Sequence, residues 1–218
     1  MRLRCLAGGV CLAIGLSMSY AIPAEAATLP SLTKMRTVLL RDADLPATFD
    51  RDRTSSDSTT ASSTDPRCTS KVSDGALLSP LRDAPRVVHR SFQASRTGPF
   101  VTSAAAAWRG KAGADALLQH LRRVLRTCDS WTETDDDGIR YRIRLSRLDF
   151  PRLGADRVAL RYTVIARGVI DVRGHSDIVV VRVRNGVTAV GEARIGSAVP
   201  VDQEALTRLS VNRLSAIL

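Results

Sequence analysis

The sequence has no motif that identifies a reaction, and it contains very little lysine. It lacks a G-x-S-x-G nucleophile elbow, a Walker phosphate loop, an H-E-x-x-H zinc motif and a G-x-G-x-x-G dinucleotide fingerprint. The sequence therefore carries no signature of the enzyme classes that these motifs identify. Lys34, Lys71 and Lys111 are the only lysines among 32 basic residues, so nearly all of the positive charge is arginine. This usage fits the codon bias of a GC-rich genome. We therefore expect no nucleic-acid partner despite the formal charge of +10.

Hydrophobic runs long enough to cross a bilayer are also lacking. The main apolar run, Leu6 to about Met18, is shorter than the roughly 20 residues that a membrane helix needs. It follows two arginines and precedes a small-residue cleavage site, Ala24-Glu25-Ala26, and this order predicts a secretory signal peptide at residues 1–26. The mature protein, residues 27–218, should then be secreted or held in the cell envelope, with no transmembrane segment.

Cysteine is scarce, and the four cysteines divide between the signal peptide and the mature chain. Cys5 and Cys11 lie in the signal peptide, where Cys11 leaves lipidation as an alternative although its surroundings make a poor lipobox. Cys68 and Cys128 remain as a pair in an oxidising compartment, so we expect a disulfide bond between them. Closing this loop would stabilise the fold by roughly 4 kcal/mol. Neither cysteine has a Cys or His at zinc-ligand spacing, and we predict no metal and no cofactor.

The mature length suits one ordinary domain. The segment 50–66 consists almost wholly of Ser, Thr, Asp and Arg and is too polar to bury. We predict that it is a mobile loop tied down at Cys68. A linker between two domains is the alternative, but the piece before it is too short to fold alone.

Hydrophobic periodicity predicts helices at Ser31 to Leu40, at Lys111 to Thr127 and at Asp202 to about Ile217, with Asp202 as the N-cap of the last one. Period-2 patterns predict six strands: Arg86 to Ser95, Phe100 to Trp108, Ile139 to Leu145, Arg157 to Arg167, Ile178 to Arg184 and Val187 to Ile195. Asn185-Gly186 predicts a tight hairpin between the last two. A change of parity after Leu145 predicts a bulge near Ser146.

Strands joined mainly by hairpins, with helices at both ends and one in the middle, favour an α+β fold. We expect an antiparallel β-sheet packed on one face by helices, with one disulfide. The other face of such a sheet can stay in contact with water.

Arginines at period 2 suggest what occupies the wet face. Arg140, Arg142 and Arg144 alternate with apolar residues, and Arg161 on the next strand could extend the row. Guanidinium groups at this spacing could form an anion-binding face suited to acidic polymers of a cell envelope. The alternative is a solubilising surface with nearby aspartates as weak partners.

Other residues give weaker indications of chemistry. His89, His120 and His175 stand apart, and we predict no catalytic residue among them, although a secreted hydrolase with an unrecognised active site stays an alternative. The segment Gly174 to Asp177 contains His, Ser and Asp, but we interpret it as a turn. The run Asp135 to Asp137 lacks calcium-loop spacing and indicates a solvated acidic turn.

Two segments of the chain resemble a known family. They are Leu39-Leu40-Arg41-Asp42-Ala43-Asp44-Leu45-Pro46, followed by a cysteine in the next loop, and Leu125-Arg126-Thr127-Cys128-Asp129-Ser130-Trp131. This order resembles actinobacterial exported sensor-like proteins, which are similar to the PknH-type extracellular sensor domain.

The resemblance implies an antiparallel sheet with flanking helices, a cleft for an envelope or extracellular ligand, and no enzyme activity. This chain departs from the kinase in having no kinase domain, no transmembrane helix and one cysteine pair where the kinase sensor pattern has two. We therefore predict an exported, non-enzymatic ligand-binding domain. The alternatives are the secreted hydrolase and a basic protein that binds anionic envelope polymers.

Overall fold

A computed structural model describes residues 28–52, 61–167 and 171–218. The predicted signal peptide, residues 1–26, lies outside the described residues. Within the described ranges no helix is long and apolar enough to cross a membrane.

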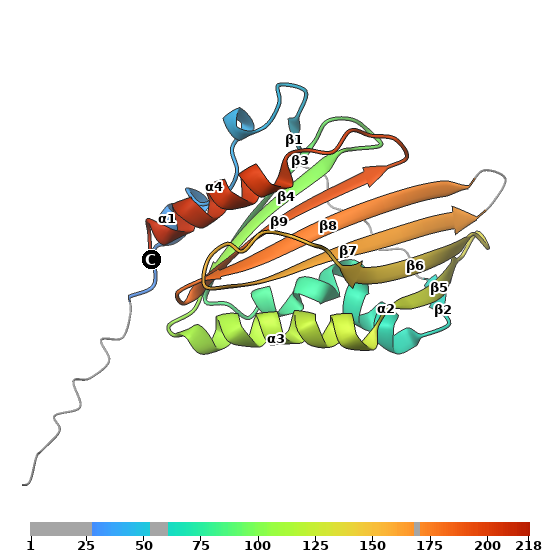
Figure 1. The fold of residues 1–218 in the computed structure, drawn as a ribbon, viewed down its shortest axis with the longest axis horizontal. Coiled ribbons are helices and arrows are strands. Elements are labelled where there is room, and N and C mark those ends of the chain that lie inside the picture. The colour runs from blue at the N-terminus through green and yellow to red at the C-terminus, as the bar shows by residue number, and fades with distance from the viewer. Residues whose placement is uncertain (1–27, 53–60, 168–170) are drawn as a thin grey trace, which may run out of the picture.

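The described residues form one nine-stranded antiparallel sheet in the order β1-β3-β4-β9-β8-β7-β6-β5-β2 (Figure 1). The strands are β1 (Asp50–Asp52), β2 (Ala61–Ser63), β3 (Arg86–Gln93), β4 (Phe100–Ala107), β5 (Ser130–Asp135), β6 (Arg140–Arg147), β7 (Asp156–Arg167), β8 (Val172–Val183) and β9 (Gly186–Ile195). From β5 to β9, consecutive strands pair with each other, as hairpin connections require. The predicted α+β class with an antiparallel sheet is confirmed.

Helices pack on the sheet from both sides (Figure 1). They are α1 (Leu32–Arg36), η1 (Asp42–Asp44), α2 (Pro66–Val72), η2 (Ser73–Leu81), α3 (Lys111–Thr127) and α4 (Gln203–Ser215). On the apolar stripe of α3, Leu117, Leu118 and Leu121 are fully buried against one face of the sheet, as the sequence predicts, whereas Leu125 is partly buried. The structure adds that α1 and α4 cover part of the opposite face, where Val179 and Val181 are buried.

The ends of the segment 50–66, predicted as loop, form the two edge strands of the sheet. An edge strand needs only backbone pairing, which polar residues permit. The Cα atoms of Asp52 and Ala61 are nine residues apart along the chain and can therefore be separated by at most roughly 32 Å. In a flat sheet of this order the two edges would lie roughly 38 Å apart, because neighbouring strands are separated by about 4.8 Å. The sheet must therefore twist and curl.

The predicted bulge near Ser146 is wrong. Pairing of β6 with β7 is regular through Arg147 opposite Leu160. The parity of the apolar residues changes because the chain leaves the sheet after β6 and crosses to the other face, where Phe150 and Leu153 join the core beneath α4.

The predicted turn from Gly174 to Asp177 is also wrong, because these residues lie within the long strand β8. The predicted hairpin between β8 and β9 is present, but Arg184 and Asn185 form its loop, and Gly186 pairs with Val183. Arg184 takes the left-handed backbone conformation, with φ 51°. Glycine is needed at 186 for packing, since a Cβ there would lie 3.0 Å from the carbonyl oxygen of Ala106.

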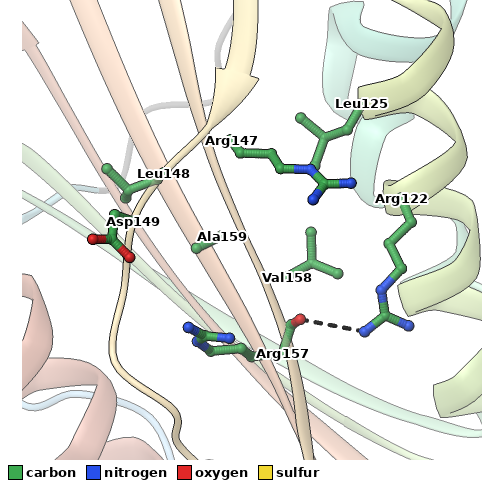
Figure 2. Close-up of a pocket in the computed structure, with 8 residues that line it drawn as sticks. All are labelled: Arg122, Leu125, Arg147, Leu148, Asp149, Arg157, Val158 and Ala159. Atoms are coloured by element: carbon green, nitrogen blue, oxygen red, sulfur yellow. Dashed lines mark hydrogen bonds between the residues drawn. The ribbon is translucent and has the colours of Figure 1, made fainter.

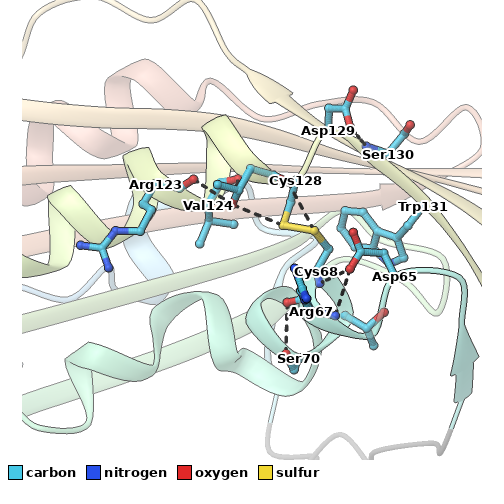
Figure 3. The surroundings of a disulfide bond; sticks show 12 residues. Asp65, Arg67, Cys68, Ser70, Arg123, Val124, Cys128, Asp129, Ser130 and Trp131 are labelled. Carbon is cyan, nitrogen blue, oxygen red and sulfur yellow. Dashed lines mark hydrogen bonds between the residues drawn. A yellow bond between two sulfur atoms is a disulfide. The ribbon is translucent and has the colours of Figure 1, made fainter.

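The predicted disulfide between Cys68 and Cys128 is confirmed, and it joins α2 to the C-terminal end of α3 (Figure 3). Both cysteines are buried. The carboxylate of Asp65 accepts hydrogen bonds from the backbone N–H groups of Arg67 at 3.0 Å and Cys68 at 3.2 Å, so it caps the start of α2. The bond thereby fixes the chain that follows β2 against the α3 layer.

A largely buried ion pair joins segments near the two ends of the described chain. The Arg213 guanidinium on α4 donates to both carboxylate oxygens of Asp44, at 2.6 and 2.9 Å, and to the carbonyl oxygen of Leu39 at 3.1 Å. Burial alone would raise the pKa of the Asp44 carboxyl, but the hydrogen bonds from Arg213 and from the backbone of Arg41 outweigh burial and lower it. Its side chain is 11% exposed and that of Arg213 is 19% exposed, so neither charge is well hydrated.

We expect Arg213→Met to lower the free energy of unfolding by about 3 kcal/mol, because it leaves the Asp44 carboxylate buried without its partner. Urea denaturation at neutral pH measures this loss. The difference from the wild type should shrink as the pH falls through the lowered pKa of Asp44. Arg208→Met is the matched control on the same helix, where an exposed pair with Glu204 should contribute less than about 0.5 kcal/mol. Equal losses in the two variants would contradict the role of the buried pair.

Candidate functional site

The sheet face opposite α3 is only partly covered by helices. On this face α1 packs on β3 and β4, whereas α4 packs on β8 and β9 (Figure 1). Ile143 and Leu145 of β6 are buried beneath α3, so the arginines that alternate with them point to the opposite face. There they border a hollow of about 540 Å³ that also involves β7 and β8.

Strand register arranges the hollow in two rows across β6, β7 and β8. In one row Arg142 lies opposite Ile165, which lies opposite Arg173. The next row contains, in the same strand order, Arg144, Thr163 and His175. Residues two strands apart are separated by roughly 10 Å, so the long arginine side chains can converge on a ligand placed over β7.

The predicted arginine residues divide between different environments. Arg142 and Arg144 line the hollow, and both are exposed. Arg140 is one further step along β6 on the same face, opposite Arg167. Arg161 instead donates two hydrogen bonds of 2.6 Å to the buried carboxylate of Asp177, so its guanidinium is already bound.

Sequence reasoning did not assign Arg173 or His175 to this face. Both were placed before or within a predicted turn, which hid their alternation along β8. An explicit test of period 2 over residues 172–183 would have placed the two side chains on one face.

The hollow has excess positive charge. In the described ranges Arg142, Arg144 and Arg173 form no ion pair. Asp129 also borders the hollow and accepts a hydrogen bond of 2.8 Å from the backbone N–H of Ser130, so one carboxylate stands against three guanidinium groups. On the adjoining part of the face Asp177 binds Arg161, and Glu192 accepts from Arg194 at 3.1 Å.

His175 is the titratable group at the centre of this charge. Its Nδ1 lies 3.3 Å from the Thr163 hydroxyl. Burial lowers the pKa of the His175 imidazole, and the positive charges of Arg194, Arg161 and Arg173 lower it further. The imidazole is therefore mostly neutral at pH 7, and a bound anion would favour its protonated form.

The other candidate residues do not assemble into a catalytic group. His89, His120 and His175 lie on β3, α3 and β8 respectively. Ser176 points to the opposite face of the sheet from His175 and Asp177, because side chains alternate along β8. Among the described residues there is no group of three or more His, Cys, Asp or Glu that could hold a metal ion.

The acidic run after β5 is a turn stabilised by its own first carboxylate. Asp135 accepts a hydrogen bond of 2.6 Å from the Tyr141 hydroxyl and two more from the backbone N–H groups of Asp137 and Ile139. The Tyr141 hydrogen bond is the largest cause of the lowered pKa of the Asp135 carboxyl. These three hydrogen bonds stabilise the charge of the Asp135 carboxylate, so a bound cation is not needed to explain its position.

We expect folding stability to fall as the pH decreases below about 6.5, because His175 and His120 both have pKa values lowered by burial in the folded state. The unfolded chain then binds more protons than the folded chain does. Urea unfolding at pH 7.5, 6.5 and 5.5 should show this loss, and His175→Gln should reduce it. An unchanged pH dependence in a His120→Gln, His175→Gln double variant would contradict the assignment.

Comparison with known proteins finds a likeness in three dimensions. No family model matches the sequence, and no curated protein matches it. The structure is similar to the crystal structure of the extracellular domain of PknH from Mycobacterium tuberculosis, with a TM-score of 0.57 and 14% sequence identity. The match covers 87% of this chain and 97% of the other. This chain therefore shares the fold of that extracellular domain, as the sequence resemblance predicts.

Proposed function

We propose that this protein is an exported, non-enzymatic sensor-like domain that binds an anionic ligand in the hollow on the bare sheet face. The observation that carries the proposal is the group of three guanidinium groups, from Arg142, Arg144 and Arg173, which form no ion pair among the described residues and outnumber the one carboxylate at the hollow, that of Asp129. Unpaired guanidinium groups around one hollow favour carboxylate or phosphate groups, which they can bind through two hydrogen bonds at once.

A repeating polyanion suits the hollow better than a small isolated ion. Along β6 the side chains of Arg140, Arg142 and Arg144 recur at roughly 6.8 Å on the same face. A polymer with regularly spaced negative groups could therefore engage several arginines together. Acidic polymers of a cell envelope have this chemistry.

An extracytoplasmic location is supported by two independent observations. The Cys68–Cys128 bond is of the kind that persists in oxidising compartments. The similar solved structure is described as an extracellular domain. Together with the predicted signal peptide at residues 1–26, these observations favour export.

We expect Arg142→Gln with Arg144→Gln to weaken binding of short-chain polyphosphate by at least about tenfold, because two charged hydrogen-bond donors are lost. Isothermal titration calorimetry at low and moderate salt measures this change. Wild-type affinity should fall with salt, and it should rise as the pH drops through the pKa of His175, because a protonated imidazole adds positive charge to the hollow.

The matched control is Arg96→Gln with Arg109→Gln, which removes the same charge from exposed positions away from the hollow. This control should bind polyphosphate within about twofold of the wild type. If both double variants lose affinity equally, the binding is a general effect of net charge and the hollow is not a site.

Export is tested by the intact mass of the protein recovered from its host. We expect the mass of residues 27–218, because cleavage should follow Ala26, and a gain of two hydrogens when the Cys68–Cys128 bond is reduced. Mass spectrometry before and after reduction distinguishes the outcomes. A mass that includes residues 1–26, or an added lipid, would contradict soluble export.

A further inference from the structure

A second hollow lies on the other side of the sheet, where β6 ends beside α3 (Figure 2). Regular pairing of β6 with β7 stops at Arg147, and one more backbone hydrogen bond runs from the N–H of Leu148 to the carbonyl oxygen of Ala159 at 3.1 Å. The chain then leaves for the opposite face. A cleft of about 490 Å³ opens between this part of β7 and α3.

The apolar side chains at the cleft come from three segments: Leu125 from α3, Val158 from β7, and Leu148, which closes one side. Ala159 borders the cleft with its backbone, because its side chain packs into the core of the opposite sheet face. Figure 2 shows the Val158 side chain standing between the guanidinium groups of Arg147 and Arg122. The cleft therefore combines apolar contact area with positive charge above it.

Of the three arginines at the cleft, two have hydrogen-bond partners in the protein and one forms no ion pair among the residues that the structure describes. Arg122 binds the Asp156 carboxylate at 2.5 Å and also contacts the carbonyl oxygen of Arg157 at 3.4 Å. The Arg157 Nε donates to the carbonyl oxygen of Phe150 at 2.9 Å. Arg147 is exposed and forms no ion pair in the part of the chain that the structure describes.

The remaining lining carboxylate does not neutralise Arg147. Figure 2 shows Asp149 next to Leu148, across the cleft from Arg122 and well apart from the guanidinium of Arg147. The positive charge of Arg147 is thus available to a ligand. Both contacts of Arg122, to Asp156 and to the carbonyl oxygen of Arg157, use Nη2, so its Nε and Nη1 take no part in them.

We infer that this cleft binds an amphipathic anion, with an acidic head group at Arg147 and Arg122 and an alkyl chain over Leu125 and Val158. This site shares no residue with the hollow on the opposite face and is independent of the function proposed above. A hydrophilic polyanion would leave the apolar side chains of the cleft uncovered, whereas a neutral alkyl compound would leave Arg147 unpaired. An alkyl carboxylate satisfies both surfaces.

The test uses octanoate as the probe, with acetate and octylamine as ligands that lack the tail or carry the opposite charge. Each buried methylene should tighten binding roughly fourfold. We therefore expect octanoate to bind at least about tenfold more tightly than acetate or octylamine. In ¹H–¹⁵N spectra its titration should shift the amide signals of Leu125, Val158 and Ala159.

Arg147→Gln should weaken octanoate binding by about tenfold, because the free guanidinium is removed from an exposed position that does not support the fold. Arg126→Gln is the matched control, since Arg126 is also exposed and lies on α3 next to Leu125 but outside the cleft lining. It should change affinity less than about twofold.

Three results would overturn the inference: equal binding of octylamine, no effect of Arg147→Gln, or a loss of octanoate binding in the Arg142→Gln, Arg144→Gln double variant. The last result would place octanoate in the hollow on the opposite face. Octanoate binding that survives in that double variant while polyphosphate binding fails would support two separate sites.

Discussion

The structure depends on the way in which helices cover one half of the central strands and leave the other half bare. Val179, Val180 and Val181 of β8 have no exposed surface, because α3 lies over one face and the α1 and α4 layer lies over the other. A few residues earlier on the same strand, Arg173 is exposed and His175 is half-buried. One continuous ladder of hydrogen bonds thus holds a packed core at one end and a polar surface at the other.

Carboxylate partners mark the border between these two halves. Asp177 holds Arg161 and Glu192 holds Arg194, and both carboxylates are buried. Charges that enter the core are therefore paired there, as their desolvation requires. The arginines farther along the bare half, including Arg142 and Arg173, lie beyond these carboxylates. The same residue type consequently stabilises the fold in one place and offers free charge in another.

Local sequence patterns correctly predicted those helices and strands that a single repeat of apolar residues defines. The apolar stripe of α3, the alternation in β6 and the pairing of Cys68 with Cys128 are properties of single segments or of composition, and each appears in the structure. The α+β class followed from the same patterns. The tight hairpin after β8 was also found, although its loop lies one residue earlier than the Asn185-Gly186 signal indicated.

Features that depend on contacts between distant segments could not be predicted from these local patterns. A parity change after β6 has the same appearance in sequence whether a strand bulges or the chain crosses to another face, and only the packing of Phe150 beneath α4 distinguishes the two. Gly174 and the polar residues after it suggested a turn, because nothing local shows that their neighbours on β7 and β9 hold them in a strand. Arg173 and His175 joined the arginine face only once that register was known.

The use of arginine in both settings has a physical consequence for selectivity. A guanidinium has a planar set of donors that fits one carboxylate closely, as the two 2.6 Å hydrogen bonds between Arg161 and Asp177 illustrate. Where the protein supplies that carboxylate, an external anion has no vacant donor face to bind. Where a guanidinium forms no such ion pair among the described residues, as at Arg142 and Arg144, an external anion can complete the same geometry. The position of the internal carboxylates, more than the total positive charge, therefore determines where on this arginine-rich surface an anion can bind.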